Sequence, residues 1–370
     1  MQPFDTITVP TLLIDEAIAR KNIQQMAQKA REQEVLFRPH FKTHQSLQIG
    51  EWFRQEGISK ITVSSLRMAS YFAQYGWRDI TVAFPVNLRE HVLINHLAET
   101  IQLGILAEDP AVIQQLTELI KAPLKIWLKI DAGYHRTGLD WKNQETILEC
   151  AARIKENPQF KFMGLVSHAG NSYHTPKEKI SDLFTESIQR LQIVQQTLQD
   201  AGHDRVLISV GDTPGCSLST SFGGADEIRP GNFVYYDSQQ LMIGSCTFEQ
   251  IAAVVACPIV ALHPDRQEVV LYGGAVHLSK DTVTVEDQST YGLICYPEGE
   301  SWSKPITGGY VKSLSQEHGI VFLPESAFSR CQIGDLLCVI PAHSCLAADL
   351  LGTAINTRGE SIHMFQAAAS

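Results

Sequence analysis

One lysine near the N-terminus has the surroundings of a reactive amine. Lys42 follows a short apolar run, residues 35–37, that is typical of a β-strand, and an amphipathic pattern resumes a few residues later. In α/β barrels the carboxyl ends of the strands carry the chemistry. We expect the neighbours Arg38, His40 and Phe41 to desolvate this ammonium group and to place other cations near it. Both effects favour the neutral amine, which can form a Schiff base with a carbonyl.

A histidine and a cysteine near the C-terminus form a second candidate site. His343 and Cys345 follow the apolar run 336–340, so we expect an extended segment in which residues two apart face the same side. An imidazole nitrogen and a thiolate can bind one metal ion, and the sulfur favours zinc over magnesium, manganese or calcium. Taken alone, such a pair is more often a core histidine beside a buried cysteine. It also supplies fewer than the three protein ligands that catalytic zinc usually has.

The chain of 370 residues is longer than one hydrophobic core usually supports, so we expect two domains. Residues 10–245 alternate strand-like and helix-like segments, which predicts an α/β fold, a (β/α)8 TIM-type barrel. A doubly wound open sheet is the alternative, but no Gly-x-Gly-x-x-Gly turn follows the first strands. The expected strands are residues 35–38, 60–64, 80–84, 101–106, 124–131, 162–168, 206–210 and 226–229. The expected helices are residues 15–33, 44–56, 66–75, 88–98, 109–120, 142–156 and 176–201, the last beginning with Pro176 as its first helical residue.

The remaining part of the chain has a different sequence pattern. Residues 246–370 contain short β-rich runs separated by Gly, Pro, Asp and Asn, with no long helical pattern. They predict a second, smaller all-β domain that carries the His343–Cys345 pair, and we expect residues 1–9 to join it.

Composition narrows the possible partners and location. The net charge of −10 argues against nucleic acid or an anionic membrane as the main partner, and we expect neither. Residues 1–10 do not resemble an export signal, and the longest apolar stretch, residues 251–262, is broken by Pro258 and is too short to span a membrane. The eight cysteines show no regular spacing, which is typical of reduced thiols in a cytoplasmic protein.

Both candidate sites resemble motifs of one enzyme family. The run Arg38-Pro39-His40-Phe41-Lys42-Thr43-His44 resembles the pyridoxal-phosphate lysine motif of the D-threonine aldolase and D-serine dehydratase family. These are fold-type III enzymes, whose barrel resembles that of alanine racemase. The run Pro341-Ala342-His343-Ser344-Cys345, at the other end of the chain, resembles the metal motif of the same family. The resemblance implies that Lys42 holds pyridoxal 5′-phosphate and that His343 and Cys345 bind Zn²⁺.

The resemblance also implies contacts to the cofactor at the ends of four predicted strands. An arginine would lie near the ring, a tyrosine would contact the cofactor, and a threonine, a glycine and an asparagine would bind the phosphate. In this sequence they are Arg136, Tyr173, Thr213, Gly231 and Asn232. Small residues and helix N-termini at these positions suit a phosphate. Without the resemblance, Arg136 would more often form a salt bridge at the barrel mouth, and Tyr173 would be a surface residue.

The activity implied by the resemblance is that of a dehydratase. Aldolase members carry aspartate at the position of Cys345, whereas the zinc-dependent dehydratase members carry cysteine. The expected substrate is D-serine, D-threonine or D-threo-3-hydroxyaspartate, converted to a 2-oxo acid and ammonia. The alternatives are a retro-aldol lyase of the D-threonine aldolase type and, further off, an amino-acid racemase or a non-catalytic carrier of the cofactor. A homodimer follows from the resemblance alone, and the residues that select the substrate side chain are not identified.

Overall fold

The structure is a computed structural model that describes residues 3–366, and the chain divides into two compact units. One unit contains residues 3–24, 43–49 and 232–366, and the other contains residues 25–42 and 50–231. The lysine motif is thus divided between the units, with Lys42 in one and Thr43 in the other. Compact units need not be independently folding domains, so the division of the chain at residue 245 stays a prediction.

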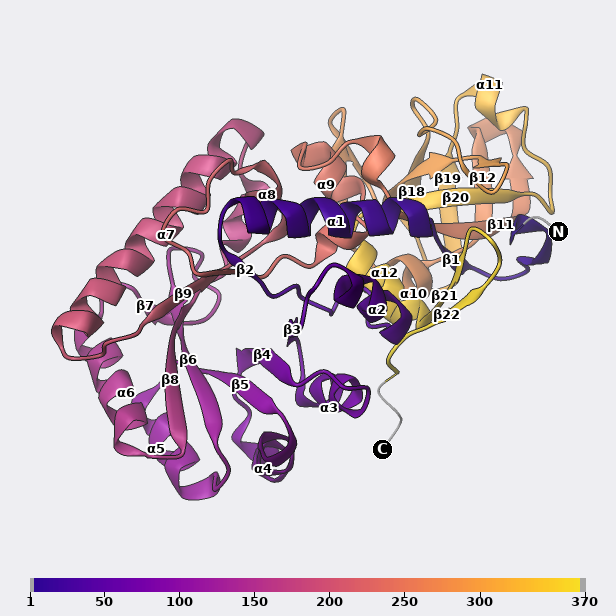
Figure 1. Cartoon of the computed structure of the whole chain (residues 1–370). Coiled ribbons are helices and arrows are strands. Elements are labelled where there is room, and N and C mark those ends of the chain that lie inside the picture. Colours follow the sequence, from indigo (N-terminus) through magenta and orange to yellow (C-terminus); the bar gives the residue numbers. More distant parts are fainter. Residues whose placement is uncertain (1–2, 367–370) are drawn as a thin grey trace. The chain divides into compact units, whose positions relative to one another are not determined.

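The unit of residues 25–42 and 50–231 is a nearly closed barrel of eight parallel strands, which confirms the predicted (β/α)8 fold (Figure 1). A bridge between His40 and Thr62 joins its first and last strands, so the open-sheet alternative is wrong. In their order around the barrel, the strands are β2 (Leu36–Phe37), β10 (Glu227–Ile228), β9 (Leu207–Val210), β8 (Phe160–Val166), β6 (Leu124–Asp131), β5 (Gln102–Ala107), β4 (Asp79–Pro85) and β3 (Lys60–Val63). The short β7 (Leu139–Asp140) pairs only with β6.

Helices follow the strands, and their ends lie within a few residues of the predicted ends. The longest, α7, begins at Lys177, and Pro176 is its N-cap instead of its first helical residue. Seven buried residues on one face of α7 pack toward the barrel, as its sequence pattern predicts. The helices are α1 (Glu16–Glu32), α2 (Leu47–Gln55), α3 (Leu66–Gln74), α4 (His91–Thr100), α5 (Pro110–Leu119), α6 (Gln144–Glu156), α7 (Lys177–Asp200) and α8 (Thr213–Leu218).

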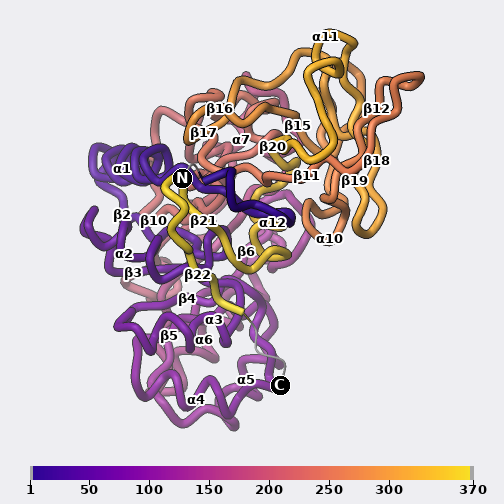
Figure 2. Tube along the Cα trace, turned by 90° about the vertical axis from the view of Figure 1, so that its right-hand side faces the viewer, coloured from indigo at the N-terminus to yellow at the C-terminus, as the bar shows by residue number. Residues whose placement is uncertain are grey.

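The unit of residues 3–24, 43–49 and 232–366 contains a nine-stranded sheet that is mainly antiparallel, as expected for a second β domain. Its order is β12-β19-β18-β15-β20-β11-β1-β21-β22, and β12 also pairs with β11. Residues 11–14 form β1 in this sheet, antiparallel to β11 and parallel to β21, and Figure 2 shows this indigo strand near the yellow C-terminal strands. Residues 3–24 thus belong to this compact unit, while the expectation that residues 1–9 join the β domain stays a prediction.

The elements of this unit are mostly short. The strands are β1 (Thr11–Ile14), β11 (Ala253–His263), β12 (Glu268–Tyr272), β13 (Val283–Val285), β14 (Gln288–Thr290), β15 (Gly292–Cys295), β16 (Pro297–Glu298), β17 (Ser301–Trp302), β18 (Tyr310–Leu314), β19 (His318–Phe322), β20 (Leu336–Pro341), β21 (Thr353–Asn356) and β22 (Ser361–His363). The helices are α9 (Ser238–Ile243), α10 (Ala275–Leu278), α11 (Glu325–Phe328) and α12 (Ser344–Leu351).

All eight cysteines are buried thiols, as the sequence predicts. None of the helices in residues 3–366 has the length and apolar character needed to cross a membrane.

Buried charges inside the barrel fix the strand that leads to Lys42. Arg38 donates from Nε to Glu227 Oε2 at 2.6 Å and from Nη1 to Asp79 Oδ1 at 2.8 Å, and Lys125 Nζ donates to Asp79 Oδ2 at 3.0 Å. Burial opposes the charge of Arg38, but the attraction of Glu227 and Asp79 outweighs it and raises the pKa of the guanidinium. Removing one partner would leave an uncompensated buried charge.

We therefore predict that Glu227→Gln destabilises the protein. The loss of the carboxylate beside Arg38 should lower the free energy of unfolding by about 3 kcal/mol, within the range for a broken buried ion pair. Urea unfolding followed by circular dichroism measures this change. The matched control is Glu149→Gln, which removes an exposed helical ion pair with Arg153 at 2.8 Å and should cost less than about 0.5 kcal/mol. Equal effects of the two substitutions would contradict the role of the network.

Candidate active site

Lys42 lies in a turn, residues 41–44, that follows β2 at the carboxyl end of the barrel strand. Main-chain hydrogen bonds hold the approach to this turn: His40 N donates to Pro230 O at 2.9 Å, and Phe41 N donates to Thr62 O at 2.8 Å. The lysine side chain itself is exposed. The barrel thus presents Lys42 on a fixed backbone with its amine accessible.

The expected desolvation of Lys42 by its neighbours is wrong. Phe41 is fully buried in an aromatic cluster, with ring centroids 5.0 Å from Phe53 and Phe72 and 5.1 Å from Trp77. Arg38 is directed into the barrel, where two carboxylates compensate its charge. Sequence proximity did not reveal this because the partners of both side chains lie elsewhere in the chain.

His168 lies half-buried at the barrel mouth within the electrostatic reach of three cations, and its sequence position suggested no role. Burial is the main reason why its pKa lies well below 6.5, and the charges of Arg136, Lys129 and Lys42 lower it further. Its Nδ1 lies 2.9 Å from Gly211 O. A carbonyl oxygen only accepts, so we assign the proton to Nδ1, which leaves Nε2 of a neutral ring as an acceptor.

Lys129 is a second residue whose importance the sequence analysis missed. It is 6% exposed in the middle of β6, and burial, followed by the charges of Arg229 and Arg136, lowers its pKa to about 7. The run of residues 124–130 contains two lysines, Lys125 and Lys129, and a buried lysine is unusual in a strand that is buried on both faces. Lys42, Arg136, Lys129 and His168 thus form one electrostatically coupled group in the barrel.

Arg136 and Tyr173 lie on loops that the barrel holds firmly. Asp131 Oδ1 accepts hydrogen bonds from the main-chain N–H groups of residues 133, 134 and 135 at 2.8, 2.9 and 3.0 Å, which fixes the loop of the exposed Arg136. The guanidinium of Arg136 lies 5.5 Å from the ring centroid of Tyr134. Tyr173 is half-buried in a 3-10 helix, Gly170–His174, which Ser172 anchors by donating from Oγ to Asp212 Oδ1 at 2.7 Å.

Thr213 offers a hydroxyl that suits a phosphate. It is buried as the first residue of α8, and its Oγ1 has no hydrogen-bond partner among residues 3–366. Leaving a buried polar atom unpaired costs free energy, so a ligand that satisfies it is favoured. Gly231 follows β10, which pairs with β9, the strand before Thr213. Gly211, between β9 and α8, has φ +154°, and a Cβ there would lie 2.5 Å from Arg229 N. These residues therefore fit the phosphate end of the implied cofactor.

His343 and Cys345 come together in a different way from the one predicted. The strand β20 ends at Pro341, His343 is the N-cap of α12 with φ −135° and ψ 106°, and Cys345 lies in the first turn of the helix. The argument from strand alternation is therefore wrong. The two side chains are nevertheless within hydrogen-bonding reach of each other. Although burial opposes its charge, Cys345 and Asp237 raise the pKa of His343 well above 6.5.

Buried polar groups surround this pair within the β-rich unit. Thr43 Oγ1 lies 3.1 Å from Cys345 Sγ, and Asn232 Nδ2 lies 3.6 Å from the same sulfur. Asn232 Nδ2 also donates to Asp237 Oδ2 at 2.6 Å and to Ser344 Oγ at 3.0 Å. The side-chain nitrogen of Asn232 therefore serves this cluster, and a contact of Asn232 with phosphate would have to come from its main chain.

The donor set of this cluster suits a soft divalent ion. Imidazole nitrogen and thiolate sulfur are common zinc ligands. The hydroxyl of Tyr235, which interacts electrostatically with Cys345, and the Oδ1 of Asn232 are buried and have no hydrogen-bond partner among residues 3–366. Across the same residues, no group of three or more His, Cys, Asp or Glu side chains is arranged to hold a metal. The pair fits a metal that keeps open positions for other ligands.

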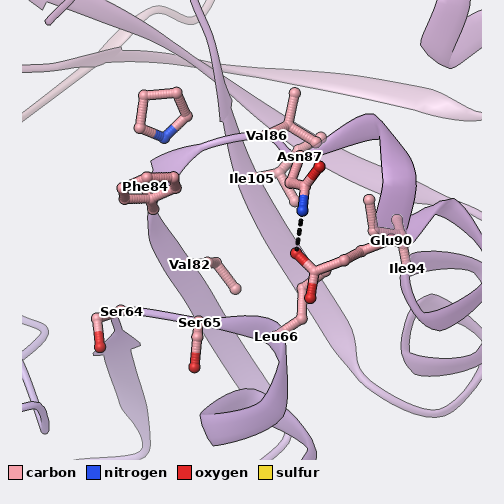
Figure 3. Close-up of a pocket in the computed structure, with 11 residues that line it drawn as sticks. Ser64, Ser65, Leu66, Val82, Phe84, Val86, Asn87, Glu90, Ile94 and Ile105 are labelled. Atoms are coloured by element: carbon pink, nitrogen blue, oxygen red, sulfur yellow. Dashed lines mark hydrogen bonds between the residues drawn. The ribbon is translucent and has the colours of Figure 1, made fainter.

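A separate cavity of about 190 Å³ lies between the barrel wall and α3 and α4, close to the ends of β3 and β4 (Figure 3). Its wall is mainly apolar, with Leu66, Val82, Ile94 and Ile105 among the lining residues. Asn87 Nδ2 donates to Glu90 Oε2 at 3.1 Å at its polar side. None of the residues predicted to bind the cofactor or the metal lines it, so it does not contribute to the candidate site.

The fold and the two motifs define a class of enzymes, the fold-type III pyridoxal-phosphate enzymes. Residues 14–239 match the family model described as "Alanine racemase, N-terminal domain", and residues 252–356 match "Putative serine dehydratase domain". The chain belongs to the family of proteins with an alanine racemase N-terminal domain. In this sequence a serine-dehydratase-type domain follows that domain. The resemblance noted in the sequence is confirmed.

Relatives of known name match nearly the whole chain. A D-serine dehydratase of Dictyostelium discoideum is 29% identical, covering 98% of this chain and 97% of the relative. A D-threo-3-hydroxyaspartate dehydratase of Delftia sp. (strain HT23) is 27% identical, covering 92% of this chain and 91% of the relative. The solved structure of the Delftia sp. HT23 protein has a TM-score of 0.91 at 24% identity and covers 99% of both chains, which shows that the fold is shared.

The buried carboxyl of Asp212, the N-cap of α8, gives a testable dependence of stability on pH. Burial raises its pKa from 3.8 to about 6, against the lowering effects of hydrogen bonds from Ser172 and Gly215 and of the charge of Arg229. Between these two pKa values the folded state binds more protons than the unfolded state, so the free energy of unfolding falls as the pH rises.

Asp212→Asn should remove this dependence. Relative to the variant, the wild type should lose about 2 kcal/mol between pH 4 and pH 7, most of the free energy that corresponds to its shifted pKa. Urea unfolding of both proteins at several pH values measures the difference. Parallel stability profiles of the wild type and the variant would show that Asp212 does not titrate in this way.

Proposed function

We propose that this protein is a pyridoxal-phosphate- and zinc-dependent dehydratase that converts a D-3-hydroxy amino acid into a 2-oxo acid and ammonia. Relatives named for D-serine and D-threo-3-hydroxyaspartate support this substrate class, and D-threonine belongs to it as well. The observation that carries the proposal is the distance of 3.1 Å between Thr43 Oγ1 and Cys345 Sγ, because Thr43 directly follows Lys42. Thr43 is part of the lysine motif, so within the β-rich unit a residue of that motif contacts the metal motif.

Lys42 would hold the aldehyde of pyridoxal 5′-phosphate. Thr213, Gly231 and the main chain of Asn232 would lie at the phosphate, and Arg136 and Tyr173 would lie near the ring. The bound cofactor supplies an electron sink for negative charge at the α-carbon of the substrate. The Nζ of Lys42, as a free amine, would take the proton from that carbon. The exposed position of Lys42 gives a substrate access to this amine.

His343 and Cys345 would bind Zn²⁺, which supplies Lewis-acid assistance to the departing β-hydroxyl. Hydroxide is a poor leaving group, so elimination needs such assistance. Thr43 and Asn232, which both contact Cys345, hold the sulfur in place. Loss of water and subsequent hydrolysis give the 2-oxo acid and ammonia.

A retro-aldol lyase of the D-threonine aldolase type is the second candidate function. It would use the same amine and metal, and would release glycine and an aldehyde. Cys345 favours the dehydratase, because the resemblance places an aspartate there in the aldolases. In a racemase or a non-catalytic carrier, a metal bound by His343 and Cys345 would have no β-hydroxyl to activate. From the resemblance we also infer a homodimer in the cytoplasm, and the eight buried thiols support a reducing compartment.

Lys42→Ala should abolish the covalent attachment of the cofactor. The wild type, dialysed after reconstitution, should keep a visible absorbance band that borohydride removes, and the variant should lose the band on dialysis. Turnover should fall by about 10²–10⁴-fold, the usual contribution of a general base. The matched control is Lys177→Ala, an exposed lysine at the start of α7, which should keep both properties. A retained borohydride-sensitive band in Lys42→Ala would assign the cofactor to another lysine.

The products distinguish the two candidate functions. The wild-type enzyme, incubated separately with D-serine, D-threonine and D-threo-3-hydroxyaspartate, should form 2-oxo acid and ammonia in equal amounts. A coupled dehydrogenase assay measures the 2-oxo acid, and chromatography measures glycine. Glycine with an equal amount of aldehyde as the main products would favour the aldolase and overturn the dehydratase.

A further inference from the structure

The two carboxylate oxygens of Asp237 have different partners. Oδ1 accepts from Gln240 N at 2.9 Å and caps α9. Oδ2 faces donors from two other segments: Asn232 Nδ2 at 2.6 Å, Ser344 N at 3.0 Å and His343 Nδ1 at 3.2 Å. Asp237 is fully buried, so water does not compete for these contacts. Helix capping accounts for Oδ1 and leaves the role of Oδ2 unexplained.

The contact with Oδ2 fixes the tautomer of His343. Because a carboxylate oxygen only accepts, Nδ1 must carry a proton, and the lone pair of a neutral ring then lies on Nε2. A histidine that binds a metal needs this lone pair, and it commonly donates its other N–H to a carboxylate that sets the ring orientation. Ser344 N binds the same oxygen, so Asp237 also fixes the backbone between His343 and Cys345.

We propose that Asp237 is the positioning residue of the zinc site, which holds His343 with Nε2 directed to the ion that it shares with Cys345. This inference rests on the proposed function. Asp237 acts through His343 and Ser344 and does not contact the substrate. The hydroxyl of Tyr235 and the Oδ1 of Asn232, both buried without a hydrogen-bond partner in residues 3–366, lie on the same cluster, which supports a site built to receive a ligand.

Asp237→Asn separates positioning from capping. The asparagine oxygen can still cap α9, since asparagine is as good an N-cap as aspartate. Its NH₂ group would then face the N–H groups of His343 and Ser344, which lose the carboxylate oxygen that accepts from them. The dissociation constant for zinc should rise by about 10–100-fold. Competition with a chromophoric chelator measures it on the purified full-length enzyme. In the cobalt-substituted enzyme, the thiolate-to-cobalt absorbance of Cys345 should need a correspondingly higher cobalt concentration.

The matched control is Asp109→Asn, the same substitution at another N-cap. Asp109 Oδ1 accepts from Ala111 N at 2.6 Å and Val112 N at 3.3 Å at the start of α5, and the variant should bind zinc like the wild type. Thermal unfolding with and without zinc gives a second measurement, the increase in melting temperature that zinc causes. A purely structural role of Asp237 would leave this increase unchanged. Loss of capping alone lowers the melting temperature equally in both conditions, whereas loss of positioning reduces the stabilisation by zinc.

The outcomes distinguish this inference from the proposed function. Asp237→Ser, which keeps a capping hydroxyl but has no Oδ2, replaces Asp237→Asn if that variant does not fold, and should show the same loss of zinc affinity. Wild-type zinc affinity in either variant, together with loss of zinc in His343→Ala, would overturn the positioning role and leave the zinc site intact. Wild-type affinity in His343→Ala would overturn the proposed site and this inference together.

Discussion

The backbone from Arg38 to Thr43 is the constraint on which the candidate site depends. Arg38 is fixed by Glu227 and Asp79, His40 by the carbonyl of Pro230, and Phe41 by the carbonyl of Thr62 and an aromatic cluster. Thr43 contacts Cys345. A reactive amine must be held where its substrate binds, yet stay accessible. This segment achieves both because its buried neighbours hold the backbone, while the side chain of Lys42 is exposed.

The barrel could be predicted well because its strands are short apolar runs at regular intervals between amphipathic segments. The strand β6, Leu124–Asp131, has the predicted bounds, and the others differ by a few residues. Closure could not be predicted from that pattern, since it depends on the single bridge between His40 and Thr62. The β-rich unit was recognisable by its short apolar runs between turn residues. The parallel pairing of β1 with β21 could not be predicted, because it joins opposite ends of the chain and neither segment indicates its partner.

The candidate site was predictable only as far as its motifs extend. The motif around His343 was found, but its geometry was inferred from a strand, whereas the helix α12 begins at Ser344. An N-cap histidine without a capping hydrogen bond leaves little trace in a sequence. Asp237 was missed because its contacts with the metal motif, at His343 and Ser344, are more than one hundred residues away in the sequence. Lys129 was missed because nothing in the sequence of β6 distinguishes it from Lys125, which is only half-buried and pairs with Asp79.

In the proposed reaction Lys42 removes the α-proton, and the metal held by His343 and Cys345 assists the departure of the hydroxyl. Exchange of the α-proton of D-serine with deuterium, followed by NMR in the zinc-free holoenzyme, tests this division most directly. We predict that exchange continues while formation of 2-oxo acid stops, and that added zinc restores product formation. Product formation at the full rate without zinc would contradict the central claim.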